Sequence, residues 1–194
     1  SIPVDDTATF DYRLENLGNV SLAFASLTDD NGTPGNPSDD FQPSPVLQGN
    51  FNIGDTNQNE LIDVGEVWRY ESTRTVTAGP YANEAVAVAV EPETSQQATD
   101  NDVSHHLGSD PQVRLVKQTN GEQANEPPGV FLRVGETATF TYLASNVGNV
   151  PLVPTRLVDD NGTPDIPSDD FSPDEIQDSN QDNVGDTNGN GLLD

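Results

Sequence analysis

Residues 7–16, TATFDYRLEN, return as residues 137–146, TATFTYLASN, 130 positions further along this chain of 194 residues. Between residues 7–46 and 137–176, 23 of 40 aligned positions are identical without a gap. Further matches at the same offset are GNV at 18–20 and 148–150 and DDNGTP at 29–34 and 159–164, and GDTN at 54–57 returns at 185–188 after one inserted residue. Self-similarity at a fixed period indicates repeated copies of one folding unit.

The repeat divides the chain into two expected domains, residues 1–108 and residues 109–194. A strand-like run at 112–116 precedes the second copy and has no counterpart before the first copy. The second copy stops at Asp194, within a motif that the first copy completes. We therefore expect a first domain that lacks its N-terminal strand, a second domain truncated at its C-terminus, and further copies on both sides.

The hydrophobic pattern has the period of β-strands throughout. Apolar and polar side chains alternate between 7 and 15, and Trp68 and Tyr70 alternate with Arg69 and Glu71. Residues 85–90, AVAVAV, are apolar on both faces, which is typical of a central strand. No segment carries a helical stripe. The sequence predicts an all-β chain of tandem immunoglobulin-like β-sandwich repeats, each with about seven strands.

The composition is strongly acidic and lacks cysteine. The 33 acidic residues, 22 of them Asp, give a formal net charge of -26. Such a charge repels nucleic acid and anionic membranes, and no apolar run reaches the ~20 residues of a membrane span. We expect no nucleic-acid partner and no membrane insertion. Asp beside Asn and Gly suits turns and hard cations, whereas halophilic adaptation, the alternative, would spread the charge over the surface.

The most specific motif is DTNQNELIDVGE at residues 55–66, which fits a twelve-residue calcium loop. Its expected ligands are Asp55, Asn57, Asn59, the Leu61 carbonyl, Asp63 and Glu66. The usual glycine at position six is Glu60 here, whereas the second copy has Gly191. A strand pattern follows Glu66, so we expect a structural clamp rather than a calcium sensor. The competing interpretation is a polar turn.

The second copy and the acidic clusters extend the candidate metal site. The expected ligands of the second loop are Asp186, Asn188, Asn190 and Asp194. One loop upstream lie the clusters Asp29, Asp30, Asp39 and Asp40 and, in the second copy, Asp159, Asp160, Asp169 and Asp170. These clusters either complete the same calcium site, form a second one, or are solvated Asx turns.

The sequence offers little for catalysis, and we expect no enzyme. The two histidines, His105 and His106, fall in an expected linker, and neighbouring side chains of an extended segment point to opposite faces. Nucleophile elbows, phosphate loops and zinc spacings are absent from the sequence.

The motifs GETATFTY at 135–142, LIDVGEVWRY at 61–70 and YANEAV at 81–86 resemble the repeat domains of giant bacterial surface and adhesin-like proteins. These immunoglobulin-like repeats are similar in turn to the calcium-binding B-repeats of staphylococcal adhesins. The resemblance implies an extracellular, cell-surface stalk that is stiffened by Ca²⁺ and whose partners are neighbouring repeats of the same chain or filament. The alternatives are an adhesin module that binds a glycan or protein ligand, and a subunit of a polymerised surface filament that receives a strand from its neighbour.

Overall fold

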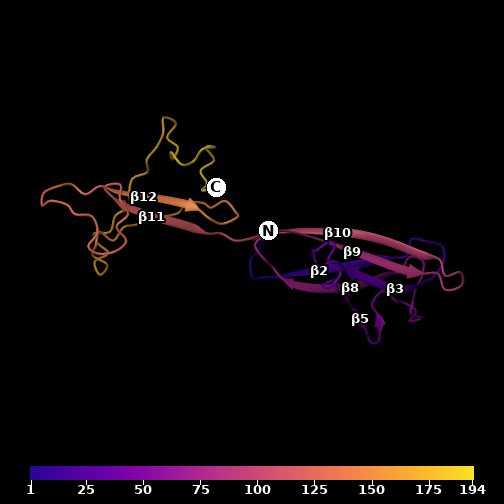
Figure 1. Ribbon diagram of the computed structural model, residues 1–194. Coiled ribbons are helices and arrows are strands. Elements are labelled where there is room, and N and C mark those ends of the chain that lie inside the picture. The colour runs from indigo at the N-terminus through magenta and orange to yellow at the C-terminus, as the bar shows by residue number, and fades with distance from the viewer. The chain divides into compact units, whose positions relative to one another are not determined.

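The computed structural model describes all 194 residues and divides the chain into two compact units, Ser1–Ser109 and Asp110–Asp194. All of its regular elements are strands, so the prediction of an all-β chain is confirmed (Figure 1). None of these elements is a helix with the length and apolar character needed to cross a membrane.

Ten strands form the first unit. They are β1 (Ile2–Pro3), β2 (Thr7–Glu15), β3 (Leu22–Asp29), β4 (Ser44–Pro45), β5 (Leu47–Gln48), β6 (Phe51–Asn52), β7 (Leu61–Ile62), β8 (Val67–Thr75), β9 (Gly79–Val90) and β10 (Gln97–Ser109). One sheet has the strand order β1-β10-β9-β3-β7, a second has the order β2-β8-β4, and β5 and β6 form a short ribbon. Several packed sheets of this kind are compatible with a β-sandwich.

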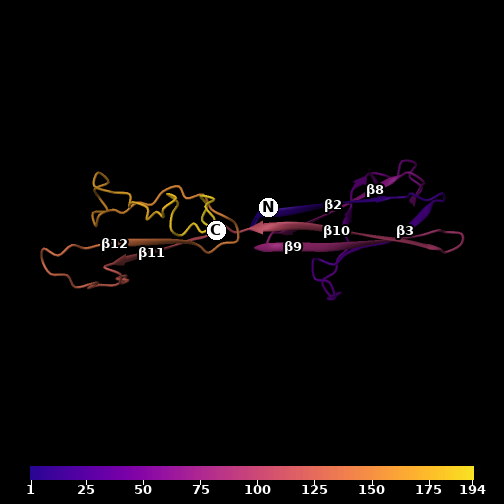
Figure 2. The ribbon, with the colours of Figure 1, turned by 90° about the horizontal axis from the view of Figure 1, so that it is seen from above.

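The longest pairing in this unit is the antiparallel hairpin of β9 and β10. Its register runs from Gln97 opposite Val90 to Gly108 opposite Gly79, and the two strands lie side by side in both views (Figures 1 and 2). On its other edge β9 pairs with β3. The run of Ala and Val at 85–90 therefore lies in a central strand, as predicted, with its alanines facing the core, whereas Val86 on the other face is 37% exposed.

The hydrophobic core lies between the five-stranded and the three-stranded sheet. Its buried members are Leu27, Ile62, Trp68, Tyr70 and Ala89, with Tyr12, Leu14, Leu22, Phe24, Ala85 and Ala87 packed against them. The Phe24 ring stacks on Tyr70 at 5.3 Å and on Trp68 at 6.4 Å between ring centroids. Because alternate residues of each strand enter this core, the two-residue period of the sequence translates directly into burial.

The histidines lie elsewhere than expected. His105 and His106 belong to β10, where they pair with Ala82 and Tyr81, so the expected linker is wrong at these positions. The His106 ring packs on the Tyr81 ring at 4.7 Å between centroids. Burial and the nearby Arg74 guanidinium lower the pKa of His106.

The second unit contains two regular strands, β11 (Val113–Thr119) and β12 (Phe140–Asn146). They pair antiparallel, with Val113 opposite Asn146 and Thr119 opposite Phe140. The residues that follow β12 form turns and isolated bridges, among them Asp159 to Phe171, which repeats the bridge from Asp29 to Phe41 in the first unit.

Candidate metal site

The candidate calcium loop, residues 55–66, connects β6 to β8 and contains β7. Asn52 fixes the start of the loop, because its side chain donates to the Arg69 carbonyl at 2.8 Å and accepts from the Arg69 amide at 2.9 Å. Asn16 fixes β7, because its amide nitrogen donates to the Ile62 carbonyl oxygen at 2.6 Å. Both asparagines are buried. The loop is therefore attached to the frame of the sheets at its start and at β7 within it.

Four of the predicted ligands, Asp55, Asn57, Asn59 and Asp63, form one hydrogen-bond network. The buried Asp55 carboxylate accepts from the backbone amides of Asn59 at 3.1 Å and Glu60 at 3.0 Å. The side-chain nitrogens of Asn57 and Asn59 both donate to Asp63 Oδ2, at 2.7 and 3.0 Å. The spacing of two residues thus places these side chains on the inside of one turn, as a calcium loop requires.

Glu66 closes the loop from its last position. Its Oε1 accepts from the Thr56 amide at 2.8 Å and the Thr56 hydroxyl at 2.7 Å, and its Oε2 accepts from the Asp63 amide at 3.1 Å. The Trp68 indole nitrogen lies 3.4 Å from the same Oε2. Burial raises the pKa of Glu66, but these donors outweigh burial and hold that pKa below its usual range. The carboxylate is thus kept ionised inside the loop.

Asp63 receives a further donor from outside the loop. Ser21 donates its hydroxyl proton to Asp63 Oδ1, and this bond, followed by those from Asn57 and Asn59, lowers the pKa of Asp63. The amide of Leu61, the residue whose carbonyl is a predicted ligand, donates to Asn59 Oδ1 at 2.8 Å. Ser21 is replaced by Pro151 in the second copy, so this support belongs to the first loop alone.

The second loop repeats the network of the first. Asp186 accepts from the amides of Gly189 at 2.8 Å and Gly191 at 2.7 Å, which lowers its pKa chiefly through the Gly191 amide. The side-chain nitrogens of Asn188 and Asn190 donate to Asp194 Oδ2 at 2.6 and 3.1 Å. Two segments 131 residues apart therefore adopt one arrangement of carboxylates and amides.

The backbone of the two loops differs in strain. Gln58 and Glu60 adopt left-handed conformations, with φ of 62° and 61°. The matching positions in the second copy are Gly189 and Gly191, with φ of 67° and 73°. Glycine adopts this region without a steric cost, whereas other residues pay about 1–2 kcal/mol. Glu60 therefore strains the backbone of the first loop at the position where the second loop has Gly191.

The upstream acidic clusters occupy turns. Asp29 accepts from the Asn31 amide at 2.9 Å, and Asp30 accepts from the amides of Gly32 and Glu84, both at 2.9 Å. In the second copy, Asp159 and Asp160 accept in the same way from the amides of residues 161 and 162. These are Asx turns in both units.

The remaining members of the clusters lie farther along the same loops. Asp39 accepts from the Thr33 hydroxyl at 2.8 Å, and Asp169 accepts from the Thr163 hydroxyl at 2.8 Å. Asp40 and Asp170 are exposed. The hydrogen bonds of these clusters do not extend to the residues of loop 55–66 or loop 186–194.

The donor set of the twelve-residue loops suits calcium. Its members are carboxylate, amide and carbonyl oxygens, the ligand types that calcium selects, and asparagine amides present oxygen or nitrogen by rotation about one bond. His, Cys, Asp and Glu side chains alone do not form a cluster of three or more that could hold a metal ion. A site here therefore needs Asn57, Asn59 and the Leu61 carbonyl in addition to the carboxylates.

Several residues that support the loops were not predicted from the sequence. Asn16 and its repeat Asn146 each donate to the carbonyl of the residue before the loop's ninth position, Ile62 and Leu193. Their identity at the 130-residue offset is the signal that marks them. Lys117, the only lysine of the chain, binds Asp159, and nothing in the spacing of these two residues indicates it.

Comparison with known proteins adds no relative: no protein-family model, no curated protein and no solved structure matches this chain.

Proposed function

We propose that this chain is a structural spacer of an extracellular, cell-surface microbial protein, built from immunoglobulin-like repeats that calcium stiffens. The observation that carries the proposal is the shared pair of hydrogen bonds by which two asparagines bind one aspartate in each loop, Asn57 and Asn59 on Asp63 and Asn188 and Asn190 on Asp194. A turn required only for chain reversal has no need to keep all four of its oxygen-bearing side chains in both copies.

The residues that would hold calcium in the first unit are Asp55, Asn57, Asn59, the Leu61 carbonyl, Asp63 and Glu66, and in the second unit Asp186, Asn188, Asn190 and Asp194. Bound calcium would supply the positive charge that this acidic chain, with a formal net charge of -26, lacks. Because Asn16 and Asn52 attach the first loop to both sheets, rigidity gained in the loop is passed to the unit.

Under this proposal the chain is a structural protein and not an enzyme. Its partners would be neighbouring repeats, in line with the duplication of the unit within one chain. Nucleic acid and membrane insertion are not part of the proposal, since the charge of the chain opposes both.

Terbium luminescence tests the first loop directly. The only tryptophan, Trp68, contacts Glu66 through its indole nitrogen, so excitation of Trp68 should sensitise Tb³⁺ bound in this loop. We expect calcium to displace the signal, Asp63→Asn to abolish it, and Asp102→Asn, an exposed aspartate of β10, to leave it unchanged.

A thermal melt tests the consequence for stability. A ligand that binds only the folded state contributes about 2.7 kcal/mol at one hundred times its Kd. We expect excess calcium to raise the Tm and a chelator to reverse the gain. An unchanged Tm together with silent terbium would reject the calcium clamp.

A further inference from the structure

The two units have an equivalent buried carboxylate at the same place in the fold. Asp29 ends β3, Asp159 is its repeat at the 130-residue offset, and the two residues are 0% and 6% exposed. In each unit the carboxylate Oδ1 accepts from the backbone amide two residues later, at 2.9 Å. In each unit Oδ2 accepts from a tyrosine hydroxyl, that of Tyr12 or that of Tyr142. The carboxylate is therefore held in one orientation in both units.

The same oxygen atom has a second donor, and this donor differs between the units. Asp159 Oδ2 accepts from the ammonium group of Lys117 on β11, the only lysine of the chain. Asp29 Oδ2 accepts from the side-chain nitrogen of Asn83 on β9. Lys117 has no counterpart among residues 1–109, and Asn83 has none among residues 110–194. The two units therefore show different members of one cluster around the aspartate.

A repeat that contains both members brings the amine and the carboxamide together. Two nitrogen atoms that donate to one oxygen atom lie within about 6 Å of each other, because each is about 3 Å from that oxygen. The equivalence of Asp29 and Asp159 thus places Lys117 Nζ within reach of a carboxamide carbon in the position of Asn83. Two reactants that one fold holds side by side need no encounter in solution, which is a large gain in rate.

The lysine changes its surroundings once the carboxamide strand covers it. In the second unit its side chain is 43% exposed, and the pair with Asp159 is ionised, since Lys117 lowers the pKa of that carboxyl. The Lys117 nitrogen lies 4.8 Å from the centre of the Phe140 ring and 5.7 Å from that of Tyr142. Burial disfavours both charges, so full enclosure lets the proton pass from the amine to the aspartate. A neutral amine is a nucleophile.

The carboxamide of Asn83 is incompletely bonded. The residue is 4% exposed, and its Oδ1 has no hydrogen-bond partner. Half a turn of the carboxamide exchanges its oxygen and nitrogen, so that Oδ1 faces the aspartate. A protonated aspartate then donates to this oxygen, which polarises the carbonyl and supplies a donor for the negative charge that develops on it during attack.

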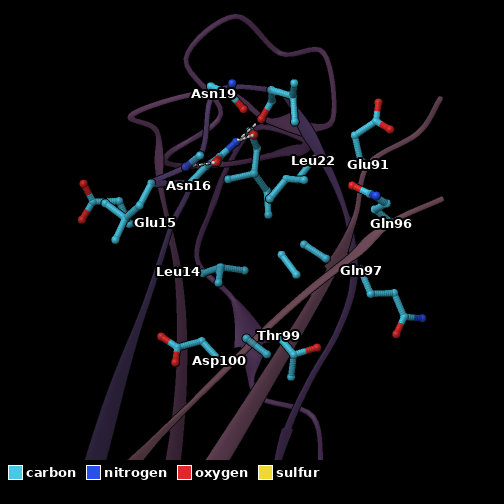
Figure 3. A pocket seen from close by; sticks show the side chains of 17 residues that line it. Leu14, Glu15, Asn16, Asn19, Leu22, Glu91, Gln96, Gln97, Thr99 and Asp100 are labelled. Carbon is cyan, nitrogen blue, oxygen red and sulfur yellow. Dashed lines mark hydrogen bonds between the residues drawn. The ribbon is translucent and has the colours of Figure 1, made fainter. Parts of the chain in front are cut away.

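The first unit by itself offers no amine to Asn83. The groove of about 390 Å³ between β2, β9 and β10 is lined by leucines, carboxamides and carboxylates, without lysine or arginine (Figure 3). Arg74 lies over the Tyr81 ring, 3.7 Å from its centroid, and a guanidinium does not give up its proton in proteins. The carboxamide therefore stays intact in this unit, and a reaction requires the strand that carries the lysine.

We propose that a repeat with all three groups forms an intramolecular amide bond between Lys117 and the asparagine in the position of Asn83, with Asp159 as proton carrier. Lys117 Nζ bonds to the carboxamide carbon, and the bond from that carbon to Nδ2 breaks. Ammonia leaves with one proton from the amine, which the aspartate transfers. No oxidant, reductant or cofactor takes part. The bond joins two strands far apart in the sequence, and the inference does not depend on calcium.

An extension of the full chain tests the proposal. Residues 64–109, added after Asp194, continue the second unit from the position that matches Asp63 and supply a second copy of Asn83. We expect the intact mass to fall short of the sequence mass by one ammonia. Protease digestion should then release a branched peptide in which Lys117 is joined to the added Asn83.

Three substitutions in the extended chain separate the roles. Lys117→Arg keeps the charge without a nucleophile and should restore the full mass. Asp159→Ala should slow the loss of ammonia about a hundredfold or more, because the proton carrier is absent. Asn101→Ala in the added segment removes an exposed carboxamide of β10 and should leave the reaction unchanged.

Two results would overturn the proposal: a full mass in an extended chain whose added residues 79–90 are protected from hydrogen exchange, or a loss of ammonia that survives Lys117→Arg. If the added segment does not fold, a peptide of residues 111–121 mixed with the unaltered chain supplies the amine to Asn83 itself. The absence of a covalent adduct in that mixture would overturn the proposal as well.

Discussion

The side-chain nitrogen of Asn16 donates to the Ile62 carbonyl oxygen at 2.6 Å across 46 residues of sequence, and to the Val20 carbonyl at 2.7 Å. Its Oδ1 accepts from the Gly18 amide at 2.9 Å. One buried amide thus holds the turn after β2 and the strand inside the candidate calcium loop. Asn146 repeats this arrangement with Val150, Leu193 and Gly148.

Replacement of Asn16 by leucine should destabilise the first unit by about 2–4 kcal/mol, because two carbonyls and one amide lose their partner in a buried setting. Guanidinium unfolding followed by Trp68 fluorescence reports on this unit alone, since the chain has one tryptophan. The control Asn19→Ala alters an exposed neighbour and should change stability by less than about 0.5 kcal/mol. Equal effects of the two substitutions would contradict a bridging role for Asn16.

Glu60→Gly should stabilise the first unit by about 0.5–1 kcal/mol. The substitution relieves a left-handed backbone at φ 61°, and the greater freedom of glycine in the unfolded chain offsets part of the gain. Glu60→Asn should give a smaller gain and Glu60→Val a loss, because asparagine tolerates this conformation and β-branched residues do not. The same unfolding assay ranks the three variants, and a different order would argue against strain at this position.

Acid should weaken the pairing of β11 with β12. The Lys117 hydrogen bond, followed by that of Tyr142, lowers the pKa of Asp159 in the folded state. Since the folded pKa is depressed, the stabilisation is present above the ordinary value of about 4 and is lost as the pH falls through the lowered folded pKa. Hydrogen exchange of the β12 amides between neutral and strongly acidic pH measures the loss. Asp159→Asn should flatten this acid dependence, and a profile as steep as that of the unaltered chain would contradict the assignment.

Alkaline titration should show delayed ionisation of the tyrosines. Burial is the largest cause that raises the pKa of all four, Tyr12, Tyr70, Tyr81 and Tyr142, and that of Tyr142 rises to about 12 with help from Asp159. Because the folded pKa of Tyr142 is raised, its contribution to stability is complete below about 10 and is lost as the pH rises through about 12. Near-ultraviolet absorbance of the phenolate follows the titration. Denaturant should return the transition to about 10, and a folded chain that already titrates there would refute the burial of these rings.

The features that the sequence predicted well are those that depend on residues close together in the chain. The two-residue alternation in Thr7–Glu15 and Val67–Thr75 predicted strands, and the spacing of Asp55, Asn57 and Asn59 predicted side chains on one turn, because neighbours within a few residues fix both features. The calcium assignment itself stays a prediction. The two histidines were misplaced because β10 extends to Ser109, through a polar stretch that resembles a linker in composition.

Such local patterns do not predict contacts between side chains that are far apart in the sequence. Lys117 and Asp159 meet across 42 residues, and Asn83 and Asp29 across 54. Their side chains come together only after the strands that carry them have paired, so no local spacing marks them. The acidic pair Asp29 and Asp30 was predicted as a set of metal ligands, with Asx turns as the alternative. Both residues accept the hydrogen bonds of Asx turns, and their role as metal ligands stays a prediction.

The pairing of β2 with β8 also affects folding during synthesis, because β8 is made well after β2. Glu15 pairs with Val67 and Thr7 with Thr75, whereas the β9–β10 hairpin closes over the short turn after Val90. Pairings distant in sequence close slowly, and a ribosome adds about 5–20 residues per second. Strand β2 therefore waits several seconds after its synthesis before its partner exists. During that interval its alternating apolar side chains are open to chaperones and to premature association, so the speed of translation through residues 16–75 bears on the yield of native protein.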